Sequence, residues 1–146
     1  MFSRLLVGAV LVLTALAGAL AAPAQASPSA NVGIAAARYV NLSPSDWCPD
    51  GYFCAFEEQG IIGRGVGFFA TEANWGAIPS EFRWINNRAR SGWNKGYYGG
   101  LDEVFVYPLP NFTHMPSIHG TCIRVGTLKG DWGTLRPESN KWLTDC

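Results

Sequence analysis

From Trp47 to the C-terminus, short apolar and aromatic runs alternate with glycine-rich turns. No stretch keeps the i, i+3, i+4, i+7 spacing of apolar residues that is typical of an amphipathic helix. The runs are instead rich in aromatic and β-branched side chains, which is typical of strands. The pattern predicts an all-β domain with strands in YFCAFEE, GVGFFA, SGWN, EVFVYP and TCIRVGTL.

The segment YFCAFEE carries apolar side chains on both of its faces. Since side chains alternate along a strand, Phe53 and Ala55 share one face, and Cys54 and Phe56 share the other. A β-sandwich buries the inner faces of two sheets against each other. This strand is therefore expected to belong to a sandwich.

The chain also contains an internal repeat. Gly63 precedes Trp75 by 12 residues, and Gly120 precedes Trp132 by 12. Both tryptophans are followed by glycine, a small residue, an aliphatic residue and, within two more positions, proline. Such self-similarity predicts two copies of one β unit.

The second copy is longer than the first. Phe56 precedes Gly63 by 7 positions, whereas Tyr107 precedes Gly120 by 13, which leaves about six extra residues in the second copy. They map to an expected surface loop that contains Thr113, His114, Met115, Pro116, Ser117, Ile118 and His119. This loop either shapes contact with a partner or is a tolerated insertion.

The N-terminus has the features of a secretory signal peptide. Residues 1–26 combine basic Arg4, an apolar run and small residues around AQA, which predicts cleavage after Ala26. This apolar run is too short, and too rich in alanine and glycine, for a typical membrane anchor. Residues 27–46 are expected to be a mobile leader, and residues 47–146 the folded domain.

The exported part is small and nearly neutral. Removing 26 residues from 146 leaves 120, with 10 basic and 11 acidic side chains and a formal charge of 10 − 11 = −1. No basic patch indicates nucleic acid or an anionic membrane as a partner. We expect one monomeric domain without a cofactor.

All four cysteines lie in the exported part, where an oxidising compartment lets disulfides persist. Four cysteines allow three pairings. Cys48 and Cys54 bracket PDGYF, whose turn chemistry can bring the two sulfurs together, and Cys122 and Cys146 remain. A zinc site would need closer ligand spacings than either pair has.

An aromatic residue in a strand, a glutamate directly after it, a glycine seven positions on and a serine in a later strand together resemble the Greek-key motif of the βγ-crystallins. Here these residues are Phe56, Glu57, Gly63 and Ser91. The resemblance implies a βγ-crystallin-like sandwich of two related motifs. In that fold a hairpin bends back over the sandwich, with a glycine at its strained bend and a serine that ties it down. Gly63 fits this role because glycine adopts positive φ without a steric penalty.

A longer string, CPDGYFCAFEE followed by GRGVGFF and NNRARSGWN, is similar to the secreted actinobacterial proteins grouped with the Streptomyces metalloproteinase inhibitor. The similarity is good over residues 47–96 and weaker over residues 97–146. It implies a secreted protein without enzymatic activity. Such a protein would bind an extracellular protease, in particular a zinc metalloprotease, as a rigid substrate-like inhibitor.

The resemblance also implies a reactive segment. The family's inhibitor offers the protease a bond within a Thr-Cys-aliphatic-Arg segment, which is similar to Thr121, Cys122, Ile123 and Arg124. Ile123 would supply the large apolar side chain that thermolysin-type enzymes favour just after the cut. This chain has Gly126 and Thr127 where that inhibitor has a further cysteine.

Metal sites are weakly indicated. His114 and His119 have no third clustered ligand, so we expect solvated loop histidines rather than a zinc site. The segment NNRARS resembles a crystallin calcium segment at Asn86, Asn87 and Ser91. Calcium needs several oxygen ligands, and the arginines of this segment oppose it, so no functional calcium site is expected.

Catalysis is not indicated either, and a second class of function stays open. The spacing of Glu57, Glu58, Glu72 and Glu81 selects no pair of carboxylates for glycoside hydrolysis. Most aromatic residues are expected in the core. Tyr97 and Tyr98, in the turn GYYGG, are candidates for exposed rings in a secreted structural or glycan-binding module.

Overall fold

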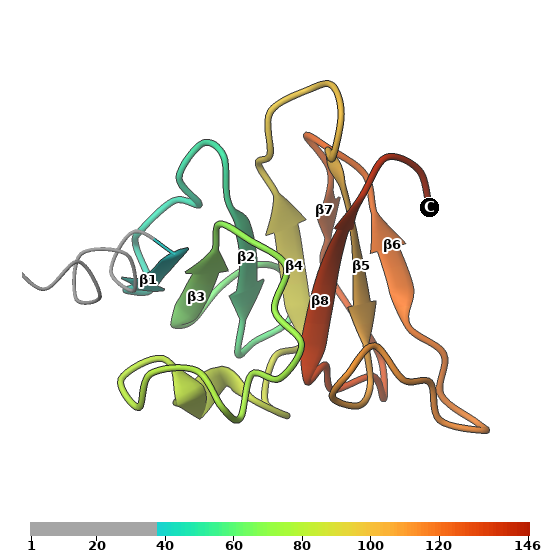
Figure 1. Ribbon diagram of the computed structural model, residues 1–146. Coiled ribbons are helices and arrows are strands. Elements are labelled where there is room, and N and C mark those ends of the chain that lie inside the picture. Colours follow the sequence, from blue (N-terminus) through green and yellow to red (C-terminus); the bar gives the residue numbers. More distant parts are fainter. Residues whose placement is uncertain (1–37) are drawn as a thin grey trace, which may run out of the picture.

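The structure is a computed structural model that describes residues 38–146; the expected signal peptide and residues 27–37 of the expected leader lie outside the described residues. Two antiparallel sheets make up the fold (Figure 1), with strand orders β1-β3-β2-β4-β7 and β6-β5-β8. The elements are β1 (Tyr39–Leu42), β2 (Phe53–Phe56), β3 (Gly65–Phe68), a 3-10 helix (Arg83–Ile85), β4 (Ser91–Asn94), β5 (Glu103–Tyr107), β6 (Thr121–Ile123), β7 (Leu128–Lys129) and β8 (Ser139–Leu143).

The all-β prediction is confirmed, and each of the five expected segments contains a strand. Phe53 and Ala55 face the main core, whereas Cys54 and Phe56 belong to a smaller cluster on the other face of β2. The segment TCIRVGTL forms two strands instead of one. It turns at Gly126, where φ is +72°, so β6 and β7 lie in different sheets.

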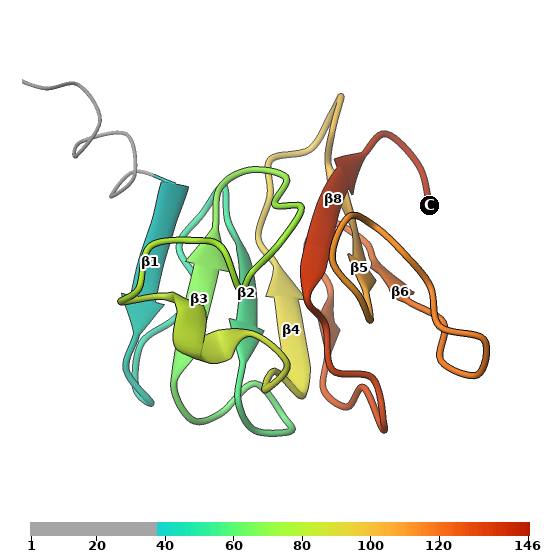
Figure 2. The same ribbon diagram turned by 60° about the horizontal axis from the view of Figure 1, so that its bottom comes forward.

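The end of the expected leader is folded, so the prediction of a mobile leader up to residue 46 is wrong for Tyr39–Leu42. These residues form β1, which pairs antiparallel with β3 and adds an edge strand to the five-stranded sheet (Figure 2). The side chains of Tyr39 and Leu42 are buried. Their burial and the strand pairing repay the entropy of ordering this short segment.

Strand β8 was not expected because its first two residues are polar. Ser139 and Asn140 are nevertheless fully buried. Asn140 accepts a hydrogen bond from the indole of Trp75 at 2.8 Å and donates one to the carbonyl of Ala70 at 3.2 Å. These hydrogen bonds offset the cost of burying a polar side chain.

The two predicted β units exchange segments between the sheets. The first unit contains β2, β3 and β4, and the second contains β5, β6 and β8. From the second unit, β7 pairs with β4 in the first sheet. From the first unit, Glu72 forms a bridge with Asn140 of β8 in the second sheet. Each unit is therefore completed by a segment of the other.

Matching serines tie down the hairpin of each unit, as the resemblance implied for Ser91. The Ser91 hydroxyl donates to the carbonyl of Glu58 at 2.6 Å and accepts from the amide of Ile61 at 2.9 Å. The Ser139 hydroxyl donates to the carbonyl of Leu109 at 2.7 Å and accepts from the amide of Phe112 at 3.2 Å. The same two bonds recur in both units.

The hairpins also share their strained turn. Ile61 has a φ of +58° and Phe112, at the same place in the second hairpin, has a φ of +60°. Gly63 lies two residues after Ile61 with a φ of +76°, as expected of the glycine at the bend. Since the two hairpins match as far as Phe112, the six extra residues of the second unit fall after it, before Gly120.

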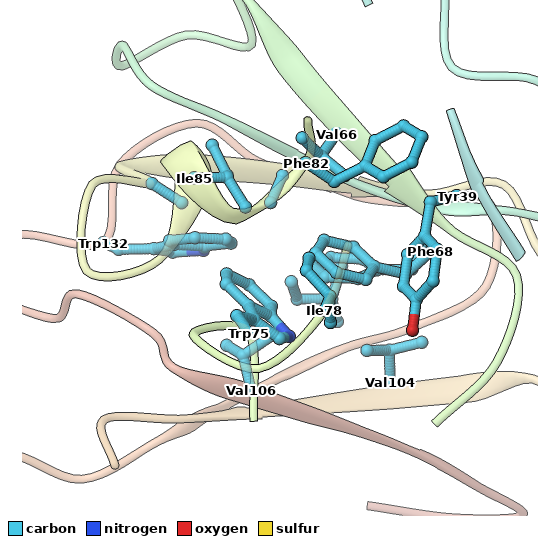
Figure 3. Close-up of a cluster of buried hydrophobic side chains, with 14 of the residues drawn as sticks. Tyr39, Val66, Phe68, Trp75, Ile78, Phe82, Ile85, Val104, Val106 and Trp132 are labelled. Atoms are coloured by element: carbon cyan, nitrogen blue, oxygen red, sulfur yellow. The ribbon is translucent and has the colours of Figure 1, made fainter. Parts of the chain in front are cut away.

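The main core lies between the two sheets (Figure 3). Trp75 is fully buried, and its ring stacks on that of Phe68 with centroids 4.6 Å apart. Ile78 and Leu135 follow the two repeat tryptophans at equal distances, and both are buried. Val104 and Val106 contribute the inner face of β5. The repeated tryptophan segments thus supply much of the core.

Both expected disulfides are present. Cys48 is bonded to Cys54, which closes the turn before β2, and Cys122 is bonded to Cys146, which joins β6 to the C-terminus. The first bridge lies in the smaller apolar cluster on the outer face of the first sheet. The second crosses 24 positions of sequence. In the loop-entropy model, a bridge of this span stabilises the folded state by about 3.5 kcal/mol.

Because Tyr39 of β1 is buried, the stability of the protein should depend on pH in the alkaline range. Burial, together with a hydrogen bond to Glu72, raises the pKa of Tyr39 to about 12 from its ordinary value of 10.0. The neutral phenol therefore contributes its full stabilisation below pH 10, and this contribution is lost as the pH rises towards 12. We expect Tyr39→Phe to lose less stability than the wild type across this pH interval. Urea denaturation of both proteins tests this, and parallel pH profiles would contradict it.

Candidate functional site

The segment expected to be reactive forms an edge strand of the smaller sheet. Thr121–Ile123 is β6, which pairs antiparallel with β5 in the register Ile123 to Val104. Ile123 is only 2% exposed and packs in the main core, whereas Arg124 is exposed. A protease could reach the Ile123 side chain only if β6 left the sheet. The expectation that Ile123 is presented to a protease is therefore wrong for this fold.

The alternation of the strand explains this placement. Val104 and Val106 face the core, so their partners Ile123 and Thr121 face the same way, and Cys122 faces outward. The outward direction lets Cys122 reach Cys146. The disulfide and the buried isoleucine together hold β6 in the sheet.

The extra residues of the second unit form a surface loop, as expected. Thr113, His114, Pro116, Ser117 and His119 are exposed, whereas Met115 and Ile118 are half-buried. The amide of Met115 donates to the carbonyl of Ile118 at 3.2 Å, and Ile118 packs against the main core. The ring of His114 lies 5.7 Å from that of Phe105 and 5.2 Å from that of Tyr107. The loop therefore rests on the outer face of β5.

Groups that could hold a metal ion are few among residues 38–146. Glu103, Cys122 and Cys146 place ligand atoms within 4.8 Å of one another, but both sulfurs belong to a disulfide and so are not thiolate ligands. His114 and His119 are not in this group. In the calcium-like segment the Ser91 hydroxyl is occupied by two backbone hydrogen bonds.

The loop 95–102, which joins β4 to β5, carries three exposed apolar side chains. Tyr97 is 68% exposed, Tyr98 80% and Leu101 63%. The exposure expected of the two tyrosines is thus confirmed. Phe69, 52% exposed, follows β3 and lies at the same hollow as Tyr97 and Leu101. The hollow has a volume of about 390 Å³, and Trp142 lies in its wall.

Sequence reasoning missed Phe69 and Leu101 as surface residues. The sequence predicts Phe69 within the strand GVGFFA. Alternation along a strand does not show that the strand ends before Phe69 or that its ring is exposed. The signal for Leu101 was its position directly after two glycines that mark a turn. Both residues become neighbours of Tyr97 only through the fold.

A buried asparagine fixes the base of this loop. Asn94 is fully buried and donates hydrogen bonds to the carbonyls of Asp102 and Ile123, both at 2.8 Å. Its side-chain oxygen accepts from the amide of Gly96 at 2.9 Å. At the tip, the amide of Gly99 donates to the carboxylate of Asp102 at 2.9 Å. The two ends of the loop are thus held together.

The composition of the hollow bears on the glycan-binding alternative. Its lining residues are Gly51, Phe69, Ala70, Thr71, Gly96, Tyr97, Gly99, Leu101 and Trp142, with no charged or amide side chain among them. The Thr71 hydroxyl already accepts a hydrogen bond from the amide of Trp142 at 3.0 Å. Sugar hydroxyls need convergent polar partners beside an aromatic ring. The hollow therefore suits an apolar ligand surface better than a sugar.

Comparison with known proteins identifies the class. Residues 43–114 match the model of peptidase inhibitor family I36. The matched segment runs from before β2 to the extra loop of the second unit and ends before β6. The match to an inhibitor family points to a protein that binds a peptidase and is not itself an enzyme.

The fold has a solved counterpart. A structure described as "Evolution of the eye lens beta-gamma-crystallin domain fold" matches with a TM-score of 0.54 and 12% sequence identity, over 74% of this chain and 98% of that chain. This similarity confirms the βγ-crystallin fold. No curated protein matches the chain. No helix within residues 38–146 has the length and hydropathy to cross a membrane.

Two neighbouring substitutions test the placement of β6. Ile123→Ala should lower the free energy of unfolding by about 2–5 kcal/mol, because it leaves a cavity in a packed core. Arg124→Ala, at an exposed position, should change it by less than about 0.5 kcal/mol. Urea denaturation of the oxidised proteins gives both values. Equal, small effects would show that Ile123 lies outside the core.

Proposed function

We propose that the protein is secreted and inhibits an extracellular zinc metalloprotease by binding it as a rigid, substrate-like partner. The observation that carries this proposal is the match of residues 43–114 to peptidase inhibitor family I36. The similarity of the sequence to the group of the Streptomyces metalloproteinase inhibitor supports the metalloprotease as the target class.

Secretion is supported by two independent features. The first 26 residues have the charge and hydropathy pattern of a signal peptide. All four cysteines of the chain are paired in disulfides, which persist in oxidising compartments and are rare in reducing ones. A protease in the same compartment is the partner that the inhibitor would meet.

Rigidity supports the mode of inhibition. A substrate-like inhibitor binds tightly when its contact segment is already held in the bound shape, because little conformational entropy is then lost. Here the two disulfides, the exchanged segments and the buried Asn94 limit the motion of the loops. The proposal does not include cleavage at Cys122–Ile123, since that would require β6 to leave the sheet.

Titration of a thermolysin-type protease with the oxidised protein tests this function. We expect stoichiometric loss of activity, while a serine protease assayed in parallel keeps its activity. Added zinc should not restore the metalloprotease, which separates binding from removal of its metal. Full activity of the metalloprotease at a large excess of the protein would refute the proposed target class.

A further inference from the structure

Exposed apolar side chains gather at one end of the sandwich. The loop between β4 and β5 rises beyond the ends of both strands (Figure 1). Among the described residues, seven large apolar side chains are more than half exposed, and Tyr97, Tyr98, Leu101 and Phe69 are four of them. Three of these four line one hollow. Contiguous exposed apolar side chains of this kind are typical of contact surfaces on soluble proteins.

The loop is held in one shape by hydrogen bonds to the core. Its base is fixed by Asn94, and its tip turns at Gly99 and Gly100, where φ is +100° and +75°. Gly96 packs so closely on Trp142 that an added Cβ would lie 2.6 Å from the indole ring. The tyrosines are therefore presented from a fixed backbone, which lowers the entropy lost on binding.

The chemistry of this surface indicates its partner. The wall of the hollow carries no charged side chain, and the exposed groups are two phenols, a phenyl ring and an isobutyl group. Tyrosine is enriched among the residues that dominate the energy of protein interfaces. The match to an inhibitor family includes this loop, whereas it ends before the segment 121–124. A peptidase cleft with apolar subsites fits both observations.

We propose that the loop 96–101, together with Phe69, is the surface that contacts the peptidase, with Tyr97, Tyr98 and Leu101 in its apolar subsites. The inference rests on the inhibitor function proposed above and adds to it the location of the contact. It replaces the segment Thr121–Arg124 in that role. The hollow beside Tyr97 then receives an apolar side chain from the rim of the cleft.

The test compares two alanine variants of the oxidised full chain. Tyr97→Ala/Tyr98→Ala removes the exposed rings of the loop. Ile62→Ala removes an exposed aliphatic side chain, 55% exposed, from the β2–β3 loop. Because β2 and β4 are antiparallel, the loops that follow them lie at opposite ends of the sheet. The inhibition constant of each is measured against the protease that the wild type inhibits in a panel of metallo- and serine proteases.

We expect the tyrosine variant to raise the inhibition constant by at least about tenfold, as loss of an aromatic interface anchor does. Ile62→Ala should stay within about threefold of the wild type. Equal melting temperatures show that both variants are folded. A tyrosine variant as potent as the wild type overturns the location alone. A wild type that inhibits no protease in the panel overturns the inhibitor function, and the location with it.

Discussion

The two β units exchange segments between their sheets, and this exchange determines how the two halves of the molecule pack together. β7 completes the sheet that contains β2, β3 and β4, and the bridge between Glu72 and Asn140 extends the sheet that contains β5 and β8. Neither β unit can complete its sheet alone. The two halves must therefore fold together, and the repeat tryptophans, which follow the exchanged segments, enter a shared core.

The exchange also explains how the surface loop between β4 and β5 is fixed at its base by hydrogen bonds to buried parts of the molecule. Asn94 ends β4, and its backbone amide donates to the carbonyl of Thr127, which leads into the exchanged strand β7. Its side chain donates to the carbonyl of Ile123 from the second unit. The base of the loop 96–101 is thus joined to both halves. A surface built in this way keeps its shape without a disulfide of its own.

Much of the fold was predictable from local patterns. These patterns involve residues that are close together in the sequence. Alternation along YFCAFEE predicted a strand, the spacing of the tryptophans predicted the repeat, and the turn within CPDGYFC predicted one disulfide pair. The edge strand β1 was missed because Tyr39–Leu42 is short and lies in a stretch rich in serine, proline and alanine without a clear period. Only its pairing with β3 makes the segment a strand. β8 was missed because Ser139 and Asn140 are buried through hydrogen bonds that depend on distant residues.

The candidate site was harder to predict than the fold. A period of two shows that Cys122 and Ile123 face opposite sides, but not which of them faces the core; the register with β5 decides that. The exposure of Tyr97 and Tyr98 followed from their glycine-flanked turn, whereas their proximity to Phe69 depends on the sheet.

Amide hydrogen exchange of the protein bound to its target protease tests the location of the contact most directly. We expect new protection in residues 96–101 and around Phe69, with the exchange of residues 121–124 unchanged. New protection in residues 121–124, with none in residues 96–101, would contradict it.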